Sequence, residues 1–263
     1  MHPVLSDVIA TFSKVPGVSA IALGGSRSIG TASPHSDFDL VVFMQKPGDI
    51  DVRAISATVT AITDGPMNVT KTLALAEFSK QGLKFDVFFR VIDKIATEIE
   101  AAASGKFSQN RHPLHPNGFI STVMISYAAY AKPLWDPEGR LARLIASTQP
   151  YPELLRQNMI SKFRTEAALA LRHAAKVEQP DEIAYLAALY AQASSIWSLA
   201  LFAINRRYPL IDKGAGKILM SLPLHPQNYQ TRTTALFHTL LAGDLKDARE
   251  KAAMLQKDVF SFD

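Results

Sequence analysis

The spacing of apolar residues changes near Gly105, and this change limits the folds open to the chain. Before Gly105, apolar residues form short runs separated by turn-favouring residues, which is typical of a sheet with connecting helices. After Gly118, they recur every three or four positions almost throughout, as on the buried faces of helices. The sequence therefore predicts an α+β protein, with a small mixed β-sheet domain in residues 1–110 and an all-α helical bundle in residues 118–263.

The same spacing predicts individual elements. The segment Arg111–Gly118 is rich in proline, histidine and glycine, and we predict that it is a linker. Strands are expected at Val18–Leu23, Phe38–Met44, Val69–Leu75 and Phe85–Val91. Helices are expected at Val4–Ser13, Ile50–Thr63, Ile92–Ala103, Phe119–Ala131, Gly139–Ala146, Leu154–Val177, Asp181–Arg207, Thr231–Leu241 and Asp244–Gln256.

Composition excludes some classes of chemistry. The chain has no cysteine, so disulfides, thiolate metal sites and a cysteine nucleophile are ruled out. The formal net charge is +4, and its lysines and arginines are dispersed rather than clustered. A nucleic-acid groove is permitted by this charge but not implied by it. Dispersed cations that face an anionic small molecule fit the charge equally well.

One segment requires a test for membrane insertion. Ile183–Asn205 carries no charge and is long enough to span a bilayer. Gln192, three serines and many alanines interrupt it, so we predict a buried central helix of the bundle. The N-terminus lacks the basic and apolar regions of a signal peptide. We therefore expect a cytoplasmic, soluble protein without a membrane partner.

A glycine-rich turn follows the first predicted strand, in the segment Leu23-Gly24-Gly25-Ser26-Arg27-Ser28-Ile29-Gly30. Glycines let the backbone approach a ligand closely, and the free N–H groups at a helix start favour phosphate oxygens. A Walker loop would need a lysine after its second glycine, and a dinucleotide fingerprint would need its first two glycines one residue apart. Neither pattern is present. The turn alone is equally compatible with a plain strand-to-helix connection.

Two aspartates at the next predicted strand favour a ligand site. Side chains alternate across a strand, so Asp37 and Asp39 share a face while Phe38 and Leu40 point to the other side. Two carboxylates this close repel each other unless a cation lies between them. Such hard oxygen ligands suit Mg²⁺, which takes its other ligands from water and phosphate.

A third carboxylate, Asp86, lies in the very apolar run Phe85–Val91. An aspartate in such a strand is costly unless it is paired or binds a metal. If this strand is the neighbour of the Asp37–Asp39 strand, three carboxylates converge on one face. That arrangement would form a two-metal site for in-line phosphoryl transfer, with Asp37 and Asp39 bridging both ions. Asp86 would bind the first ion or accept the proton of the attacking hydroxyl.

The combination resembles the nucleotidyltransferase superfamily of DNA polymerase β. The resemblance rests on Gly24-Gly25-Ser26, ten intervening residues, Asp37-Phe38-Asp39 and then Asp86. Within the superfamily, the compact form and the trailing helical domain are most similar to small bacterial members of the aminoglycoside-nucleotidyltransferase type. The resemblance implies two Mg²⁺ ions, an NTP donor such as ATP, and a cleft between the domains. It does not carry over an acceptor.

Further residues complete the predicted nucleotide site. We expect the nucleotide to contact Gly24, Gly25, Ser26, Arg27, Ser28 and Lys213, and the metal ions to contact Asp37, Asp39 and Asp86. The polar segment from Asn205 to Lys217 either holds the triphosphate or an anionic acceptor, or only carries the charge favoured at a helix C-terminus. The pair His112 and His115 has no third ligand nearby, so we expect it to be surface.

Three functions remain open from the sequence. The chemistry predicts a nucleotidyltransferase that transfers NMP to a hydroxyl of a small molecule. The same chemistry could modify a protein side chain or an RNA end, although the modest positive charge does not favour RNA. A non-catalytic antitoxin-like or nucleotide-sensing partner module is the third, and it predicts the loss of a carboxylate. All three carboxylates are present.

Overall fold

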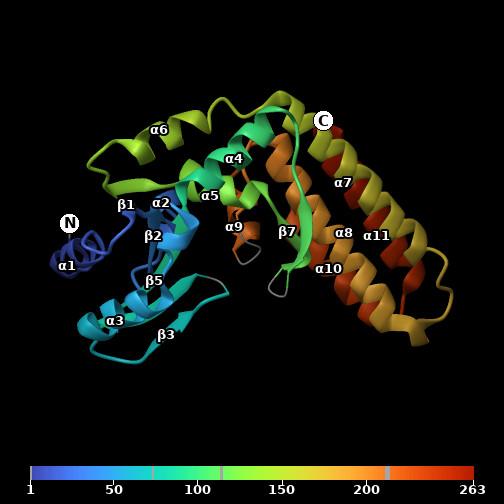
Figure 1. Ribbon diagram of the computed structural model, residues 1–263. Helices are drawn as coiled ribbons and strands as arrows, with labels where there is room; N and C mark the ends of the chain where they lie inside the picture. The colour runs from blue at the N-terminus through green and yellow to red at the C-terminus, as the bar shows by residue number, and fades with distance from the viewer. Residues whose placement is uncertain (1, 73, 113–114, 211–213) are drawn as a thin grey trace. The chain divides into compact units, whose positions relative to one another are not determined.

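The computed structural model describes residues 2–72, 74–112, 115–210 and 214–263 (Figure 1). The chain forms two compact units, and each is built from two segments: residues 1–100 with 124–150, and residues 101–123 with 151–263. The predicted α+β fold is confirmed, because a mixed six-stranded sheet lies in the N-terminal part and helices dominate the C-terminal region. The boundaries of these units differ from the predicted domain boundaries, residues 1–110 and 118–263. The predicted division into a nucleotide-site domain and a helical domain stays a prediction.

The first unit is organised around the six-stranded sheet. The strand order is β3-β4-β5-β2-β1-β8, and only the β2–β5 pair is parallel. The strands are β1 (Val18–Leu23), β2 (Phe38–Met44), β3 (Met67–Thr70), β4 (Leu75–Lys80), β5 (Leu83–Val91) and β8 (Lys132–Trp135). The central strands are rich in β-branched and aromatic residues, which pack well on a sheet that is buried on both faces.

Helices cover both faces of this sheet. On one face, the buried side chains of β2 and β5 pack with α1 (Pro3–Phe12) and α3 (Val52–Ile62). On the other face, Ala20, Ala22, Val41 and Phe43 pack with α4 (Ile92–Ala103), α5 (Thr122–Ala129) and α6 (Arg140–Ser147). The short helix α2 (Gly25–Ile29) follows β1 directly. Asp39 and Asp86 share the second face: Asp39 comes earlier in β2 than the buried residues Val41 and Phe43, and Asp86 lies opposite Asp39 in β5.

Aspartate side chains fix the starts of several helices. Asp51 accepts hydrogen bonds from the backbone N–H groups of Arg53 and Ala54 at the start of α3. The Asp136 carboxylate accepts from Leu141 N at 3.2 Å and Ala142 N at 2.9 Å at the start of α6. Such caps satisfy N–H groups that have no partner within the helix. They set where each helix begins relative to the strand that precedes it.

Two parts of the sheet differ from the sequence prediction. The single weak strand expected at Val69–Leu75 is wrong, because two antiparallel strands meet there: β3 ends at Thr70 and β4 begins at Leu75, and residue 73 between them lies outside the described residues. Strand β8, which pairs with the outer side of β1, was not predicted. It is four residues long and contains Pro133, and a proline is a poor sequence signal for a strand but is tolerated at a sheet edge.

The second unit is mainly helical. Long helices α7 (Glu153–Ala174), α8 (Ile183–Ile204) and α11 (Leu245–Val259) lie side by side, and α10 (Tyr229–Leu241) packs on α11 and α8 (Figure 1). A short helix, α9 (Ala215–Leu219), packs against α8. Single 3₁₀ turns are formed by Pro47–Asp49 in the first unit, and by Pro180–Glu182 and Phe260–Phe262 in the second. The helices predicted at Leu154–Val177, Asp181–Arg207, Thr231–Leu241 and Asp244–Gln256 are present with shifted ends.

The predicted linker Arg111–Gly118 is wrong. This stretch belongs to a two-stranded hairpin, β6 (Gln109–His112) and β7 (His115–Ile120), whose turn lies outside the described residues. The helix expected at Phe119–Ala131 is correspondingly shorter, because β7 runs to Ile120 and α5 begins at Thr122. Hairpin turns use the same proline, glycine and asparagine signals as linkers, so the sequence did not separate them.

Helix α8 occupies the core of the helical unit. By length and composition it could cross a membrane, but 56% of its most apolar window is buried. The largest buried side chain is Trp197, whose indole N–H donates to the Gln256 side chain of α11. A buried central helix, as predicted, therefore accounts for this apolar segment.

We expect Trp197→Ala to lower the free energy of unfolding by about 3–5 kcal/mol, because it removes the largest side chain of a packed core. Tyr185→Ala, on the same helix at 48% exposure, is the control and should change it by about 0.5 kcal/mol or less. Urea unfolding followed by circular dichroism measures both. Equal losses in the two variants would contradict the core position of Trp197.

Candidate active site

The glycine turn is tied to the strand that carries the aspartates. Strand β1 ends at Leu23, and the Gly24 N–H donates to the Asp39 carbonyl at 2.8 Å. Helix α2 begins at Gly25, with Gly24 as its N-cap. The first N–H groups of a helix have no partner within it, so the Gly25-Ser26 backbone presents donors at this end of the sheet. Ser26 is half-buried and adds a hydroxyl beside them.

Gly25 is in direct contact with Asp39. A Cβ atom placed on Gly25 would lie 1.9 Å from Asp39 Oδ2, and the φ of Gly25 is +55°. Both facts restrict the position to glycine, because a side chain would collide with the carboxylate and would also disfavour the left-handed backbone. The Asp39 carboxylate therefore lies against the backbone of the turn. The predicted phosphate loop and the predicted metal ligand form one local structure.

The strand pairing brings the predicted carboxylates together. Strands β2 and β5 are parallel neighbours, and their register places Asp39 directly opposite Asp86. Because residues in register share a face of the sheet, these two side chains point to the same side. Asp37 is the residue immediately before β2 and is half-buried. The condition on which the three-carboxylate hypothesis depended, that the two strands are adjacent, is met.

Electrostatics identify Asp39 as the centre of this group. Burial, followed by the negative charges of Asp86 and Asp37, raises the pKa of Asp39 to about 6. The Arg27 charge and a backbone hydrogen bond act in the opposite direction. Near neutral pH this carboxylate is therefore ionised, and its charge lowers the free energy of unfolding. A cation beside it would reverse that loss of stability.

Arg27 and Ser28, both predicted to contact nucleotide, make contacts within the protein. Arg27 Nε donates to the Asp37 carbonyl at 3.1 Å, Nη2 donates to the Ser36 carbonyl at 2.5 Å, and the guanidinium lies 4.1 Å from the centre of the Phe38 ring. The buried Ser28 hydroxyl donates to the Gly25 carbonyl at 2.9 Å. In the structure, these two side chains hold the turn and the strand start in place. Their contact with nucleotide stays a prediction.

A fourth carboxylate was missed by the sequence analysis. Glu77 of β4 lies directly opposite Asp86, so Asp39, Asp86 and Glu77 follow one another across three strands on one face. The signal was the alternation in Leu75–Lys80, where Ala76 and Phe78 are buried and Glu77 points to the other side. It was overlooked because the strand was placed at Val69–Leu75.

The donor chemistry of these residues fits Mg²⁺. Aspartate oxygens are hard ligands of the type that Mg²⁺ prefers, and the raised pKa of Asp39 records unbalanced negative charge where a cation would bind. No group of three histidine, aspartate or glutamate side chains forms a complete ligand cluster among the residues that the structure describes. Mg²⁺ usually keeps several waters and takes other ligands from phosphates, so one or two carboxylates beside a phosphate loop suffice.

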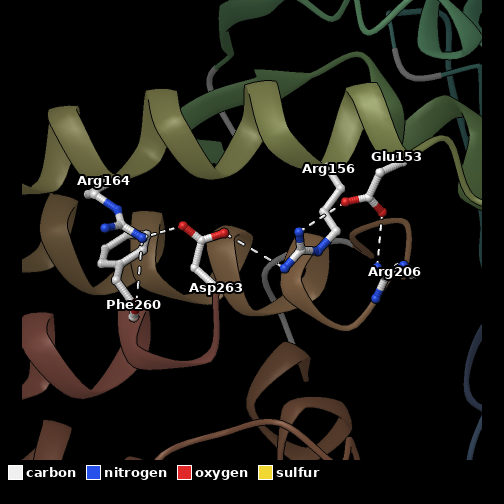
Figure 2. Close-up of polar contacts among 6 residues, drawn as sticks. All are labelled: Glu153, Arg156, Arg164, Arg206, Phe260 and Asp263. Carbon is white, nitrogen blue, oxygen red and sulfur yellow. Dashed lines mark hydrogen bonds and ion pairs between the residues drawn. The ribbon is translucent and has the colours of Figure 1, made fainter.

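Part of the polar segment after α8 makes contacts within the protein, and part of it lies outside the described residues. Asn205 bonds to backbone atoms of Leu201 and Leu224, and Arg206 Nη2 pairs with Glu153 Oε2 at 2.9 Å. Glu153 also pairs with Arg156 at 3.1 Å. Arg156 and Arg164 both form ion pairs with Asp263 (Figure 2). Desolvation raises the pKa of Glu153, but the hydrogen bonds and charges of Arg206 and Arg156 outweigh it and lower the pKa. Asn205 and Arg206 thus make contacts within the protein, while Lys213 lies outside the described residues.

A family model matches the N-terminal part of the chain. Residues 5–101 match the nucleotidyltransferase domain family, and the chain therefore contains a domain of the nucleotidyltransferase superfamily. Among solved structures, the chain is similar to a nucleotidyltransferase-like protein from Exiguobacterium sibiricum 255-15. The identity is 9%, the TM-score is 0.47, and the match covers 98% of this chain and 73% of that one. No curated protein matches the sequence.

We expect Gly25→Ala to weaken Mg²⁺-dependent nucleotide binding by about ten- to a hundred-fold, because the new methyl group displaces the Asp39 carboxylate. Gly30→Ala is the matched control, since Gly30 also has a positive φ, of +79°, but its added Cβ would meet nothing within 4 Å. Both variants should lose about 1 kcal/mol of stability from the backbone alone. Calorimetric titration measures binding, and equal binding losses in both variants would refute the contact.

We expect Asp39→Asn to stabilise the ligand-free protein by about 1–3 kcal/mol near pH 8, since it removes an ionised carboxylate whose pKa is raised to about 6. The folded-state pKa lies above the ordinary value, so protonation favours the fold. Wild-type stability from this group is therefore present at low pH and is lost as pH rises through about 6, and the advantage of the variant should vanish below about pH 4. Thermal unfolding with a chelator measures this, and an Asn variant less stable near pH 8 would contradict it.

Proposed function

We propose that the protein is a Mg²⁺-dependent nucleotidyltransferase that transfers NMP, from ATP in the first instance, to a hydroxyl of a small-molecule acceptor. The observation that supports this most is the contact of the Asp39 carboxylate with the Gly25 backbone, together with the register of Asp39 beside Asp86. In this arrangement, a carboxylate whose charge favours cation binding lies against a backbone whose N–H groups suit phosphate. A triphosphate with its magnesium ions satisfies both demands at once.

Each residue has a distinct role in this proposal. The backbone of Gly24, Gly25 and Ser26 binds the triphosphate, and the Ser26 hydroxyl adds a donor. Asp37 and Asp39 hold the cations, while Arg27 keeps the strand start in place through the Ser36 and Asp37 carbonyls. Two bound Mg²⁺ ions would supply charge neutralisation for the phosphates and a lower pKa for the acceptor hydroxyl.

Asp86 is the proton acceptor in this proposal. It is the next carboxylate after Asp39 across the sheet and is half-buried. In the transfer, the acceptor oxygen forms a bond to the α-phosphorus, the bond from that phosphorus to the bridging oxygen breaks, and pyrophosphate leaves. Asp86 would take the proton that the acceptor hydroxyl releases, or would help to hold a cation.

The first test is calorimetric titration of each NTP, with and without Mg²⁺. We expect one nucleotide to bind only in the presence of Mg²⁺, and the double variant Asp37→Asn/Asp39→Asn to lose at least about a hundred-fold in affinity because the charge that holds the cations is gone. Asp93→Asn, an exposed aspartate at the start of α4, is the charge-matched control and should bind as wild type.

Three outcomes separate the alternatives. Metal-dependent binding that is lost in the double variant supports the site and justifies a transfer assay with labelled nucleotide and candidate acceptors. Binding that is indifferent to Mg²⁺ favours a nucleotide-sensing module instead. No binding of any nucleotide by wild type would reject the proposed activity.

A further inference from the structure

A groove of about 970 Å³ lies in the second unit, between α7 and α8, and all of its lining residues belong to that unit. Helices α7 and α8 are consecutive, pack side by side and run antiparallel (Figure 1). The β6–β7 hairpin forms a wall of the groove at Gln109, Asn110 and Gly118. From Tyr185 to Ile196 the groove follows α8 for about 16 Å, or about three helical turns. None of these residues has a role in the proposed transfer.

Large apolar side chains are exposed in this groove. Tyr185 of α8 is 48% exposed, and Leu169 of α7 is 43% exposed. Single exposed apolar side chains are ordinary on a protein surface, but exposed apolar side chains gathered in a concave surface mark an interaction site. The lysine and the glutamate that line the groove, Lys162 and Glu166, pair with each other and balance their charges. The occupant therefore has to bury apolar surface and does not have to supply a net charge.

The exposed face of α8 beside the groove carries no charge, because the whole helix lacks charged residues. Its exposed positions, which recur at helical spacing, are Ala184, Tyr185, Ala188, Ala191 and Gln192. Exposed helix faces ordinarily carry charged side chains, and α11 of the same unit exposes Lys246, Glu250 and Lys257. The exposed face of α8 thus has the composition of a contact surface.

Charge and shape favour a second copy of this chain as the occupant. In a two-fold symmetric contact each copy presents the same surface to the other, so an uncharged face brings no like charges together. Tyr185 and Ala191 each lie three residues from Ala188. If two copies of α8 pack antiparallel around Ala188, the large Tyr185 side chain of each copy lies over the small Ala191 of the other. Helices that bind lipid surfaces carry lysine or arginine, and α8 has neither.

We propose that the chain forms a symmetric homodimer through the groove of α7 and α8, with the two-fold axis at Ala188. Tyr185 of each copy enters the groove of the other, where it covers Ala191 and removes the exposed Leu169 from water. The interface uses the helical unit alone, and it does not rest on the proposed nucleotidyl transfer.

Sedimentation equilibrium of the full chain over a concentration series tests the homodimer. We expect wild type to have twice the mass of the chain at high concentration and to dissociate on dilution. Ala188→Glu and Ala188→Lys should each weaken dimerisation by about a hundred-fold or more, because a charge at the axis faces the same charge of the other copy. Ala253→Glu is the matched control, since Ala253 is exposed on α11 and does not line the groove, and it should dimerise as wild type.

A mixture of the two charged variants separates self-association from any other use of this face. Equimolar Ala188→Glu and Ala188→Lys should form a heterodimer, because opposite charges then meet at the axis, and this rescue shows that both variants are folded. Tyr185→Ala should weaken dimerisation by about ten-fold or more and Tyr185→Phe by about two-fold or less, since ring packing carries the contact. The unfolding of Tyr185→Ala is measured on the monomer, at low concentration.

Several results would overturn the assignment. Wild type that stays monomeric across the series would reject the homodimer, and a dimer that both charged variants leave intact would place the interface elsewhere. Failure of the mixture to associate, with each variant folded by circular dichroism, would reject the axis at Ala188. Binding of octyl glucoside to a monomeric wild type, lost in Ala188→Glu, would assign the groove to a small amphiphile instead.

Discussion

The parallel pairing of β2 with β5 is the constraint on which the candidate site depends, because it sets two carboxylates beside each other. Parallel pairing of these strands places Asp39 opposite Asp86 on a half-buried surface, and the pKa of Asp39 rises to about 6 as a result of burial and of its acidic neighbours. Such an arrangement persists only if the surrounding structure is stable enough to impose it. The apolar packing of both sheet faces against five helices provides that stability.

Arg27 moderates the repulsion between these carboxylates without removing it. Its guanidinium binds two carbonyls of the segment that leads into β2 and stacks on Phe38, so it holds the backbone rather than pairing with a carboxylate. A direct ion pair would have neutralised Asp39 and competed with a metal ion for it. Anchoring through carbonyl groups instead leaves the negative charge in place while it fixes the position of that charge. The site is therefore rigid and still electrostatically unsatisfied, which is the state that favours binding of a cation.

The sequence was informative where local chemistry decides the structure. Gly24-Gly25-Ser26, Asp37, Asp39 and Asp86 could be singled out because glycine and acidic residues beside apolar strands have few structural explanations. Glu77 could not, since its place beside Asp86 depends on the pairing of β4 with β5, and pairing between strands is a long-range property. The hairpin in place of the linker Arg111–Gly118 has the same origin. Turn-favouring residues indicate that the chain bends, but not whether the flanking segments then pair.

Strand β8 has a consequence for how the unit that holds the sheet can be separated from the rest of the chain. Residues 132–135 close the outer edge of the sheet at β1, and α5 and α6, on either side of β8, cover the face that holds Ala20, Ala22 and Phe43. A fragment that stops at residue 110 would lose all three elements, and it would expose both an unpaired strand edge and an apolar surface. The unit that holds the sheet is thus discontinuous in the sequence, with residues 101–123 inserted within it. Any recombination or truncation that keeps this unit intact must carry residues 124–150 along with the first hundred.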